Sequence, residues 1–388
     1  MTASQLSHGR ILRPTDKVLP EYARGHNRSL VLQTLYRQGG QSRADIARET
    51  GLTRVTISDL VAQFIAEGLI VELGQREDAR PGKPATIIDI DRTAFQIIGL
   101  DLSDAVVLRG AVLDLDGGIL SRSEVSLAGS TGETAVALVT ALADELVNQA
   151  TAPILGMGVG SPGIVDLSGV VLTAPNLGWS GVELQRILQE RLSVPVLVAN
   201  DANAAALAEH SFGGADGDFI LVKVGHGVGA GLVLGGRLQF GGNFAAGEIG
   251  HVVVGTDGGP LCACGKAGCL EAWLAVPRLT ARLEQVDASF ADPDRALEQH
   301  DLILGEVGRR LGIILAPVVG ALDLAEIVLS GPAELLDGPL AAATIETLHQ
   351  RTMAEFTGDL TLRMTLQGPD IVLRGAAVMV LFGQLGVS

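Results

Sequence analysis

The sequence has few of the features that mark exported or membrane-spanning proteins. It contains three cysteines among 388 residues, and so small and odd a number does not indicate a disulfide framework. It has no run of eighteen or more apolar residues, which argues against a membrane span. The first residues, MTASQLSHGRILRPTDK, lack the apolar centre of a signal peptide. Free thiols without an export signal lead us to expect a cytoplasmic protein.

Aromatic residues are also scarce, at 3% of the chain, whereas 47% of the residues are hydrophobic and 50 are glycine. This composition supports a large core and suits an α/β protein in which helices pack closely on sheets. The length allows two or three domains.

Positive charge is scarce in most of the chain. Residues 1–90 contain 12 Lys and Arg against 10 Asp and Glu, whereas residues 91–388 contain 16 against 34. A mildly basic N-terminal part on an acidic body indicates that a polyanionic partner would meet the N-terminal part.

All three cysteines lie in one short stretch, PLCACGKAGCLE, and a histidine precedes them by eleven residues. Three thiols and one imidazole suit a closed, four-coordinate zinc site, and glycines between the cysteines allow the required tight turns. With no open coordination position, we expect the zinc to be structural. The alternative is three unrelated core cysteines. The predicted ligands are His251, Cys262, Cys264 and Cys269.

The N-terminal part divides into a segment without sustained periodicity, residues 1–25, expected to be a mobile tail, and a helical segment within residues 26–90. NRSLVLQTLYRQGG predicts a first helix that ends at Gly39-Gly40. In the next helix, Ser42 is a plausible N-cap with Asp45 in the capping-box position, and Gly51 closes that helix. The residues expected to face inward are Leu30, Val31, Leu35 and Tyr36 in the first helix and Val55, Leu60, Val61, Phe64 and Ile65 in the third.

The short turn around Gly51 gives the second and third helices helix-turn-helix spacing, which predicts that the third helix enters DNA. Two strands around a polar, proline-containing loop would follow as the wing of a winged helix, with its cations reaching a minor groove. The alternative is a small protein-interaction domain. The candidate DNA contacts are Ser42, Thr53, Arg54, Thr56, Ser58, Arg80 and Lys83.

Residues 91–388 alternate between strand and helix patterns, which indicates an α/β body. IIGLDL near Ile97 predicts a strand, AVVLRGAVLDLDGGIL a hairpin, Thr131–Asn148 a helix, and ILGMGVG another apolar strand.

GEIGH at Gly247–His251, followed by a CxCGxxGCxE pattern, resembles the signature of the ROK family of sugar kinases and sugar-responsive repressors. The resemblance covers the whole body and implies two lobes of the actin-like, ribonuclease-H-like type with a cleft between them. It also implies that His251 binds zinc through one ring nitrogen and a sugar through the other, which imidazole chemistry allows. ROK repressors carry an N-terminal DNA-binding head of the kind predicted here, and ROK kinases usually lack one.

Several polar residues near glycine-rich turns resemble the family's sugar site. Amides, carboxylates and an imidazole are the donors and acceptors that a polyhydroxylated ligand needs, although each residue alone could be a turn or cap residue. In the family's kinases the aspartate matching Asp201 is the general base for the attacking sugar hydroxyl. Here we assign it to sugar binding and predict no catalytic residue. The candidate sugar ligands are Asn176, Asn200, Asp201, Glu248, His251 and Glu271.

The loops that should face ATP depart from the kinase pattern. The family's DxGGT-type phosphate loop is replaced by Asp101-Leu102-Ser103-Asp104-Ala105, so both glycines are lost. Asp104 would repel a phosphate by about 3 kcal/mol at about 5 Å and an effective dielectric constant of about 20. His226 stands in a second glycine-rich loop where Thr is expected, and Ser330 and Pro332 replace glycines in a third.

These features favour a sugar-responsive repressor whose body binds a sugar effector and whose heads, paired in a homodimer or homotetramer, bind a double-stranded operator. The first alternative is a ROK sugar kinase that phosphorylates a hexose or N-acetylhexosamine, which Asp201 supports and the altered phosphate loop opposes. The second is a zinc-dependent scaffold without a small ligand.

Overall fold

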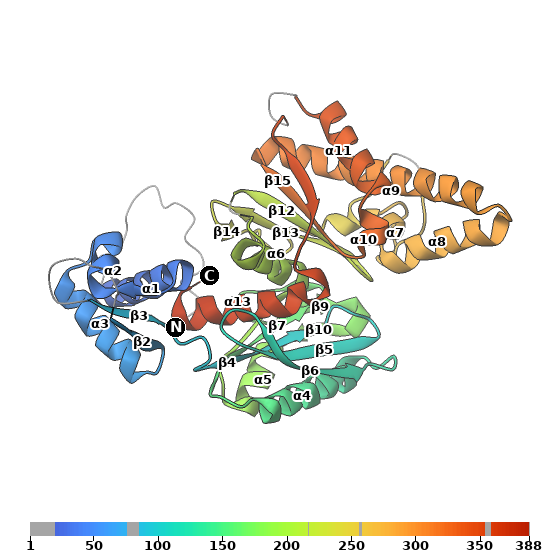
Figure 1. The fold of residues 1–388 in the computed structure, drawn as a ribbon. Coiled ribbons are helices and arrows are strands. Elements are labelled where there is room, and N and C mark those ends of the chain that lie inside the picture. The colour runs from blue at the N-terminus through green and yellow to red at the C-terminus, as the bar shows by residue number, and fades with distance from the viewer. Residues whose placement is uncertain (1–19, 76–84, 216, 256–257, 354–357, 388) are drawn as a thin grey trace.

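The computed structural model describes residues 20–75, 85–215, 217–255, 258–353 and 358–387. The chain forms an N-terminal head and two lobes, and the red C-terminal helix runs beside the head and the lower lobe (Figure 1). This arrangement confirms the predicted winged-helix head on a two-lobed α/β body.

Within the described residues, the head contains three helices and a three-stranded sheet in the order β1-β3-β2. Ser42 caps α2 and forms a capping box with Asp45, and Gly51 ends that helix with a positive φ of 69°, as predicted. The first helix begins at Pro20, inside the segment expected to be a tail, and residues 1–19 lie outside the described residues. The elements are α1 (Pro20–Gln38), β1 (Gln41–Ser42), α2 (Arg43–Thr50), α3 (Arg54–Ala66), β2 (Ile70–Gln75) and β3 (Thr86–Ile90).

The inward face of α3 differs from the prediction. Val55 is 70% exposed and Ile65 is 39% exposed, so neither belongs to the core. Thr53 caps the helix, and the buried face is a stripe that starts at Ile57. Val55 precedes Ile57 by two residues, about 200° around the helix, and therefore points to solvent. The buried residues of α3 are Ile57, Leu60, Val61 and Phe64.

The first lobe is built on a five-stranded sheet in the order β11-β7-β4-β5-β6. β4, β7 and β11 are parallel, and β5 and β6 extend the sheet as an antiparallel hairpin, as the sequence predicts. A second, three-stranded sheet has the order β10-β9-β8. The elements are β4 (Gln96–Asp101), β5 (Val107–Leu113), β6 (Ile119–Ser126), α4 (Gly132–Gln149), β7 (Ile154–Ser161), β8 (Ile164–Val165), β9 (Val171–Ala174), η2 (Pro175–Leu177), β10 (Trp179–Val182), α5 (Leu184–Leu192) and β11 (Val196–Asn200).

The second lobe repeats the arrangement of the first. Its sheet has the order β14-β13-β12-β15-β16, in which β12, β15 and β16 are parallel and β13 and β14 are antiparallel additions. This repeated order is the two-lobed pattern that the family resemblance implies. The elements are β12 (Phe219–Val224), β13 (Val228–Leu234), β14 (Arg237–Leu238), η3 (Ile249–His251), α7 (Leu270–Leu274), α8 (Val276–Ser289), α9 (Pro293–Leu322), β15 (Glu326–Ser330), α10 (Ala333–Leu336), α11 (Pro339–Arg351), β16 (Thr361–Met364) and η4 (Gly368–Asp370).

Two helices, α6 (Asp201–Phe212) and α13 (Ile371–Leu385), pack against each other between the sheets. α6 contacts β12 and β13 of the second lobe, and α13 contacts β4 and β7 of the first. A Cβ atom at Gly375 would lie 1.9 Å from the carbonyl oxygen of Ala204, so the two backbones approach as closely as glycine allows. The lobes are therefore joined through a tight contact between these helices.

The far end of α13 belongs to the same hydrophobic core as the head. Leu381 and Leu385 share this core with Val31 and Leu35 of α1. The Tyr36 hydroxyl donates to the Leu115 carbonyl oxygen at 2.7 Å. The head is thus packed onto the first lobe rather than attached only through a linker.

The segment Gly368–Leu385 is the one helical stretch among the described residues with the length and hydropathy of a membrane span, with a mean hydropathy of 1.2. Of this stretch, 61% is buried inside the protein, because α13 packs on the first sheet, α6 and the head. Its apolar character is therefore explained by its place in the core.

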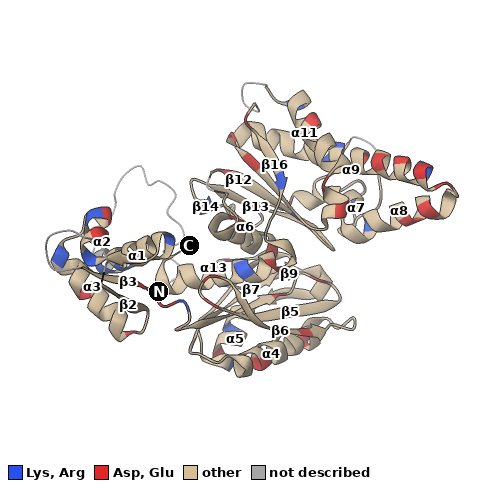
Figure 2. Cartoon of the chain, viewed as in Figure 1, with Lys and Arg blue, Asp and Glu red and all other residues tan. Residues whose placement is uncertain are grey.

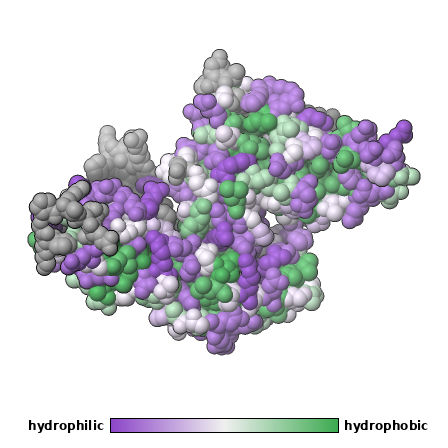
Figure 3. All heavy atoms as spheres, viewed as in Figure 1, coloured by the Kyte–Doolittle hydropathy of each residue, from purple (hydrophilic) through white to green (hydrophobic). Residues whose placement is uncertain are grey.

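Charged and apolar residues are unevenly spread over the exterior. Asp and Glu cluster along α8 and α9, and basic residues occur on α2 (Figure 2). On the face seen in Figure 3, apolar residues form several separate patches among hydrophilic ones.

Candidate functional site

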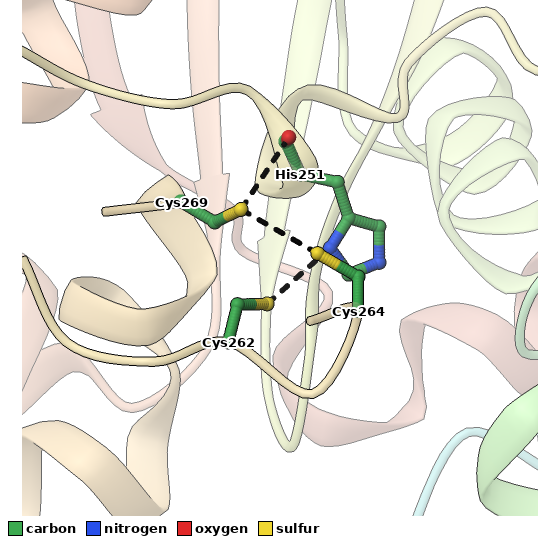
Figure 4. Close-up of side chains that lie close together, drawn as sticks. All are labelled: His251, Cys262, Cys264 and Cys269. Atoms are coloured by element: carbon green, nitrogen blue, oxygen red, sulfur yellow. Dashed lines mark hydrogen bonds between the residues drawn. The ribbon is translucent and has the colours of Figure 1, made fainter. Parts of the chain in front are cut away.

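The predicted zinc ligands converge in the second lobe. His251 ends η3, and the three cysteines lie in the turn-rich segment before α7. Backbone hydrogen bonds close that segment, from Cys262 N–H to the Lys266 oxygen at 2.8 Å and from Gly265 N–H to the Cys262 oxygen at 3.0 Å. The four candidate ligand atoms all lie within 4.8 Å of one another, as Figure 4 shows for the side chains. A set this compact can surround a single metal ion.

The environment of the thiols fits a cationic occupant. Cys262 and Cys269 are buried, and Cys264 is exposed. Burial raises the pKa of Cys262 to about 12 and also raises the pKa of Cys269, so thiolates here require compensation by positive charge. A hydrogen bond from the Lys266 backbone lowers the pKa of Cys264. Cys3His is a donor set that suits Zn²⁺ in a closed tetrahedral site.

Glu271 connects the metal loop with a neighbouring strand. Nδ1 of His251 faces the Cys262 sulfur at 3.6 Å and lies 3.9 Å from Oε1 of Glu271. The other carboxylate oxygen of Glu271 accepts a hydrogen bond from Val228 N–H of β13 at 3.2 Å. With Nδ1 directed toward the thiols, Nε2 of His251 is the ring nitrogen available to a ligand.

Asn200 and Asp201 lie where β11 ends and α6 begins. Asn200 caps α6 by accepting from Asn203 N–H at 3.0 Å, and its amide donates to the Gly163 oxygen at 2.8 Å. Oδ2 of Asp201 accepts from Nζ of Lys223 at 2.9 Å, which leaves Oδ1 of Asp201 as its second acceptor. Asn200 therefore shapes the turn, and Asp201 presents a carboxylate beside it.

Sequence reasoning missed Lys223, which lies on β12 between apolar residues in the strand FILVKV. Both members of the Lys223–Asp201 ion pair have side chains that are 16% exposed. A charged residue in an otherwise apolar strand must find a partner when the strand is buried, and that was the available signal.

Glu248 lies at the start of η3 and is half-buried. Burial raises its pKa, and the nearby charges of Asp201 and Glu271 raise it further, while His251 lowers it. Glu248 is therefore electrostatically coupled to three other predicted sugar residues, Asp201, His251 and Glu271. Asn176 is exposed on η2, and among the described residues we find no hydrogen bond from its side chain to this group.

The turn that replaces the kinase phosphate loop is closed by its own carboxylates. Asp101 accepts from Ser103 N–H at 2.9 Å, and Asp104 accepts from the N–H groups of Val106 and Val107 at 2.8 and 3.2 Å. Burial raises the pKa of Asp104, but these backbone bonds and the charges of His226 and Arg109 lower it overall. Three backbone donors of this turn are thus occupied.

The other two altered loops also lie at strand ends. His226 stands in the turn between β12 and β13, and its Nδ1 is 3.9 Å from Oδ1 of Asp104. Ser330 ends β15 and is 4% exposed, and Pro332 caps the short helix α10. Pro332 offers no backbone N–H at that helix start.

On α3, the candidate DNA contacts fall into two groups. Arg54 and Ser58 are exposed, and the Ser58 hydroxyl donates to the Arg54 oxygen at 2.9 Å. The Thr53 hydroxyl caps the helix by accepting from Thr56 N–H, and the two threonine hydroxyls lie 2.9 Å apart. Arg54 therefore has the largest exposed polar side chain at the start of this helix.

One predicted DNA contact is corrected by the structure. Ser42 is 4% exposed, and its hydroxyl is engaged in the capping box of α2, so this side chain supports the helix rather than reaching outward. Arg80 and Lys83 lie outside the described residues.

The head and the repeated sheets define the class: a two-lobed, sugar-kinase-like body with an N-terminal winged helix. The chain belongs to the ROK family, which its residues 98–381 match, and residues 26–81 match the MarR family.

Curated relatives share both parts of the chain. A xylose repressor of Caldicellulosiruptor bescii is 27% identical over 386 residues, covering 92% of this chain and 96% of the relative. The Escherichia coli K12 regulator NagC is 29% identical, covering 86% and 87%. A putative xylose repressor of Caldicellulosiruptor sp. strain Rt8B.4 is 35% identical over 254 residues, and the match spans 62% of its length.

Solved structures of a ROK regulator and a ROK kinase match different shares of this chain. A ROK family transcriptional regulator, a homologue of the E. coli Mlc protein, superposes with a TM-score of 0.81 at 23% identity, covering 94% of this chain and 98% of that one. A ROK family glucokinase from Streptomyces griseus, solved with glucose and AMPPNP, has a TM-score of 0.64 at 27% identity and covers 73% of this chain and 98% of that one. The fold of the regulator thus extends over the head, whereas the kinase match covers a smaller share of this chain.

Proposed function

We propose that this protein is a sugar-responsive transcriptional repressor of the ROK family that acts in the cytoplasm. The observation that carries this proposal is the winged-helix head, which shares one hydrophobic core with the lobe that supplies Asp101 and Asn200. The names of two relatives, a xylose repressor and an N-acetylglucosamine repressor, support it.

DNA recognition is assigned to α3 and the wing. Arg54 would read a base edge or phosphate at the start of the helix, with Ser58 and the Thr53–Thr56 pair beside it. The wing cations Arg80 and Lys83 would add contacts to the DNA backbone or minor groove. Because half-sites are read in pairs, a homodimer or a dimer of dimers would present two such heads.

The effector site is assigned to the coupled group on both sides of the lobe junction. Asp201, Glu248, His251 and Glu271 offer acceptors and a donor for sugar hydroxyls, and Asn176 and Asn200 would complete the set. A structural zinc ion held by His251, Cys262, Cys264 and Cys269 would supply the charge that keeps the thiolates ionised. It would thereby fix the loop that carries His251 and Glu271.

We infer that the body does not transfer phosphate. A kinase must direct backbone N–H groups, cations and Mg²⁺ at the triphosphate. Here Asp101 and Asp104 already accept the turn's N–H groups and add negative charge. Lys223 holds one carboxylate oxygen of Asp201, and we assign the other to hydrogen bonding with a sugar hydroxyl.

The proposal is tested by binding of DNA from upstream of the protein's own gene to the zinc-loaded chain, with and without a panel of sugars. A specific complex that one sugar dissolves or strengthens supports the repressor assignment. No specific complex under any sugar would contradict it.

The kinase alternative is tested in the same preparation. ADP formation with a hexose or N-acetylhexosamine that disappears in Asp201→Asn would restore it. We expect no sugar-dependent ADP above the level of that variant.

A further inference from the structure

The ion pair between Lys223 and Asp201 joins the two lobes at the proposed effector site. Lys223 is on β12 of the second lobe, and Asp201 follows β11 of the first, with 2.9 Å between Nζ and Oδ2. Lys223 is also coupled electrostatically to Asp101 and Asp104. The ammonium group is therefore paired with Asp201 and also feels the charges of Asp101 and Asp104.

The charges around this pair are predominantly negative. The second basic side chain in the group, Arg109, lies 3.2 Å from Asp104 and 3.3 Å from Glu124. Both cations are therefore already paired with carboxylates. The carboxylates linked by these couplings are Asp101, Asp104, Asp201, Glu248 and Glu271.

Protonation of the buried carboxyl groups does not make the net charge around this pair positive. Burial raises the pKa of Asp101 and Glu248, so both favour the neutral form more than an exposed carboxyl group does. If both were neutral, Asp104, Glu124 and Asp201 would still be paired with Arg109 and Lys223.

We propose that this arrangement restricts the effector to an uncharged sugar and excludes phosphorylated sugars, with Lys223 as the positioning residue that holds Asp201. This inference rests on the proposed sugar-responsive function and specifies the class of effector. Lys223 fixes one oxygen of Asp201, so the other is oriented to accept a hydrogen bond from a sugar hydroxyl.

A phosphorylated sugar would meet no comparable partner. A phosphate monoester carries about −1.5 to −2 charges near neutral pH and needs cations or backbone N–H groups. In the turn from Asp101 to Val107, three N–H groups are already donated to carboxylates. Repulsion by a carboxylate at about 5 Å corresponds to an affinity loss of about 100-fold.

The test is calorimetric titration of the full-length, zinc-loaded protein at pH 8 with matched pairs of ligands. The pairs are D-xylose and its 5-phosphate, D-glucose and its 6-phosphate, and N-acetyl-D-glucosamine and its 6-phosphate. We expect one neutral sugar to bind and its phosphate to bind about 100-fold more weakly. Equal or tighter binding of the phosphate would overturn the inference.

Two charge variants test which carboxylate weakens the binding of the phosphorylated sugar. Asp104→Asn retains a side-chain oxygen for the turn but removes a charge, so it should strengthen binding of the phosphorylated sugar about 100-fold and leave the neutral sugar unchanged. Glu124→Gln makes the same change at a carboxylate that is 61% exposed and serves as the control. Equal effects of the two variants would mean that local charge near Lys223 does not select the ligand.

The role of Lys223 is tested by Lys223→Arg and Lys223→Met. We expect Lys223→Met to weaken the neutral sugar at least tenfold and Lys223→Arg to restore part of the loss, with circular dichroism and zinc content as folding checks. Unchanged sugar affinity in a folded, zinc-loaded Lys223→Met variant would remove Lys223 from the site.

Operator binding separates this inference from the proposed function. If a phosphorylated sugar binds tightly and changes operator affinity, the protein is a sugar-responsive repressor but the selection inferred here is wrong. If no member of any pair binds or changes operator affinity, the effector half of the proposed function fails, and this inference fails with it.

Discussion

The head and the body hold their candidate functional residues in opposite ways. Arg54 is exposed at the start of α3, and the buried face of that helix is provided by other residues. In the body, Asp201 and Glu271 are each bonded to a neighbouring strand. We therefore expect substitutions at the candidate DNA contacts to disturb the fold less than substitutions at the candidate effector and metal ligands.

The largest effect is expected in the metal loop. Cys269→Ser should reduce bound zinc from about one ion per chain to less than about 0.1, because serine is a poor zinc ligand. Loss of the ion should destabilise the second lobe and abolish the sugar response. Atomic emission measures the zinc content, thermal unfolding measures the stability, and sugar titration measures the response.

The matched control for the metal loop is Ala263→Ser, which introduces a hydroxyl at an exposed position of the same turn. It should retain zinc and the sugar response. A normal sugar response in a zinc-free Cys269→Ser protein would mean that the proposed sugar site does not depend on the metal site.

The second-largest effect is expected in the hydrophobic core shared by the head and the body. Leu381 is fully buried in their common core, so Leu381→Ala should lower the free energy of unfolding by about 3 kcal/mol. It should also reduce the influence of sugar on operator binding, since the head loses part of its support. Phe382→Ala, at the adjacent position that is 52% exposed, should have little effect on either measurement.

Arg54→Ala tests the exposed candidate DNA contact in the head. Loss of a base or phosphate contact should weaken operator binding by about 10- to 100-fold, while sugar affinity and zinc content stay unchanged. Arg295→Ala, which removes the same charge from α9 in the second lobe, is the control. Equal operator affinity in the two variants would exclude the start of α3 from recognition.

The smallest effect is expected for Tyr36→Phe. It removes the hydrogen bond to the Leu115 carbonyl oxygen but retains the ring beneath Arg92, whose guanidinium lies 5.2 Å from the ring centroid. The expected loss is about 1 kcal/mol of unfolding free energy. Tyr36→Leu, which also removes the ring, should cost more, and a smaller loss would mean that the ring does not support the junction.

Sequence patterns predicted the parts of the molecule that depend on local rules. The capping box at Ser42, the hairpin of β5 and β6, and the grouping of His251 with the cysteines follow from residue type and spacing. The exposure of Val55 was missed because one apolar residue cannot be assigned to a helix face until the first residue of the helix is known.

The partner of Lys223 could not be predicted because it depends on how the two lobes are packed. Lys223 and Asp201 are 22 residues apart and belong to different elements, which meet only in the folded protein. The same holds for the core between head and body, in which residues of α1 contact residues of α13.

The contact between α1 and α13 also has a consequence for synthesis of the chain. A ribosome releases the head first, yet Leu381, Leu385 and Val387, which cover one apolar side of the head, are translated more than 290 residues after Ile90. Until then that side of the nascent head is exposed to water and to chaperones. The head can therefore take its final orientation only after these residues have been translated. Prematurely terminated chains, which lack them, should not form correctly arranged pairs of heads and should not compete for the proposed operator.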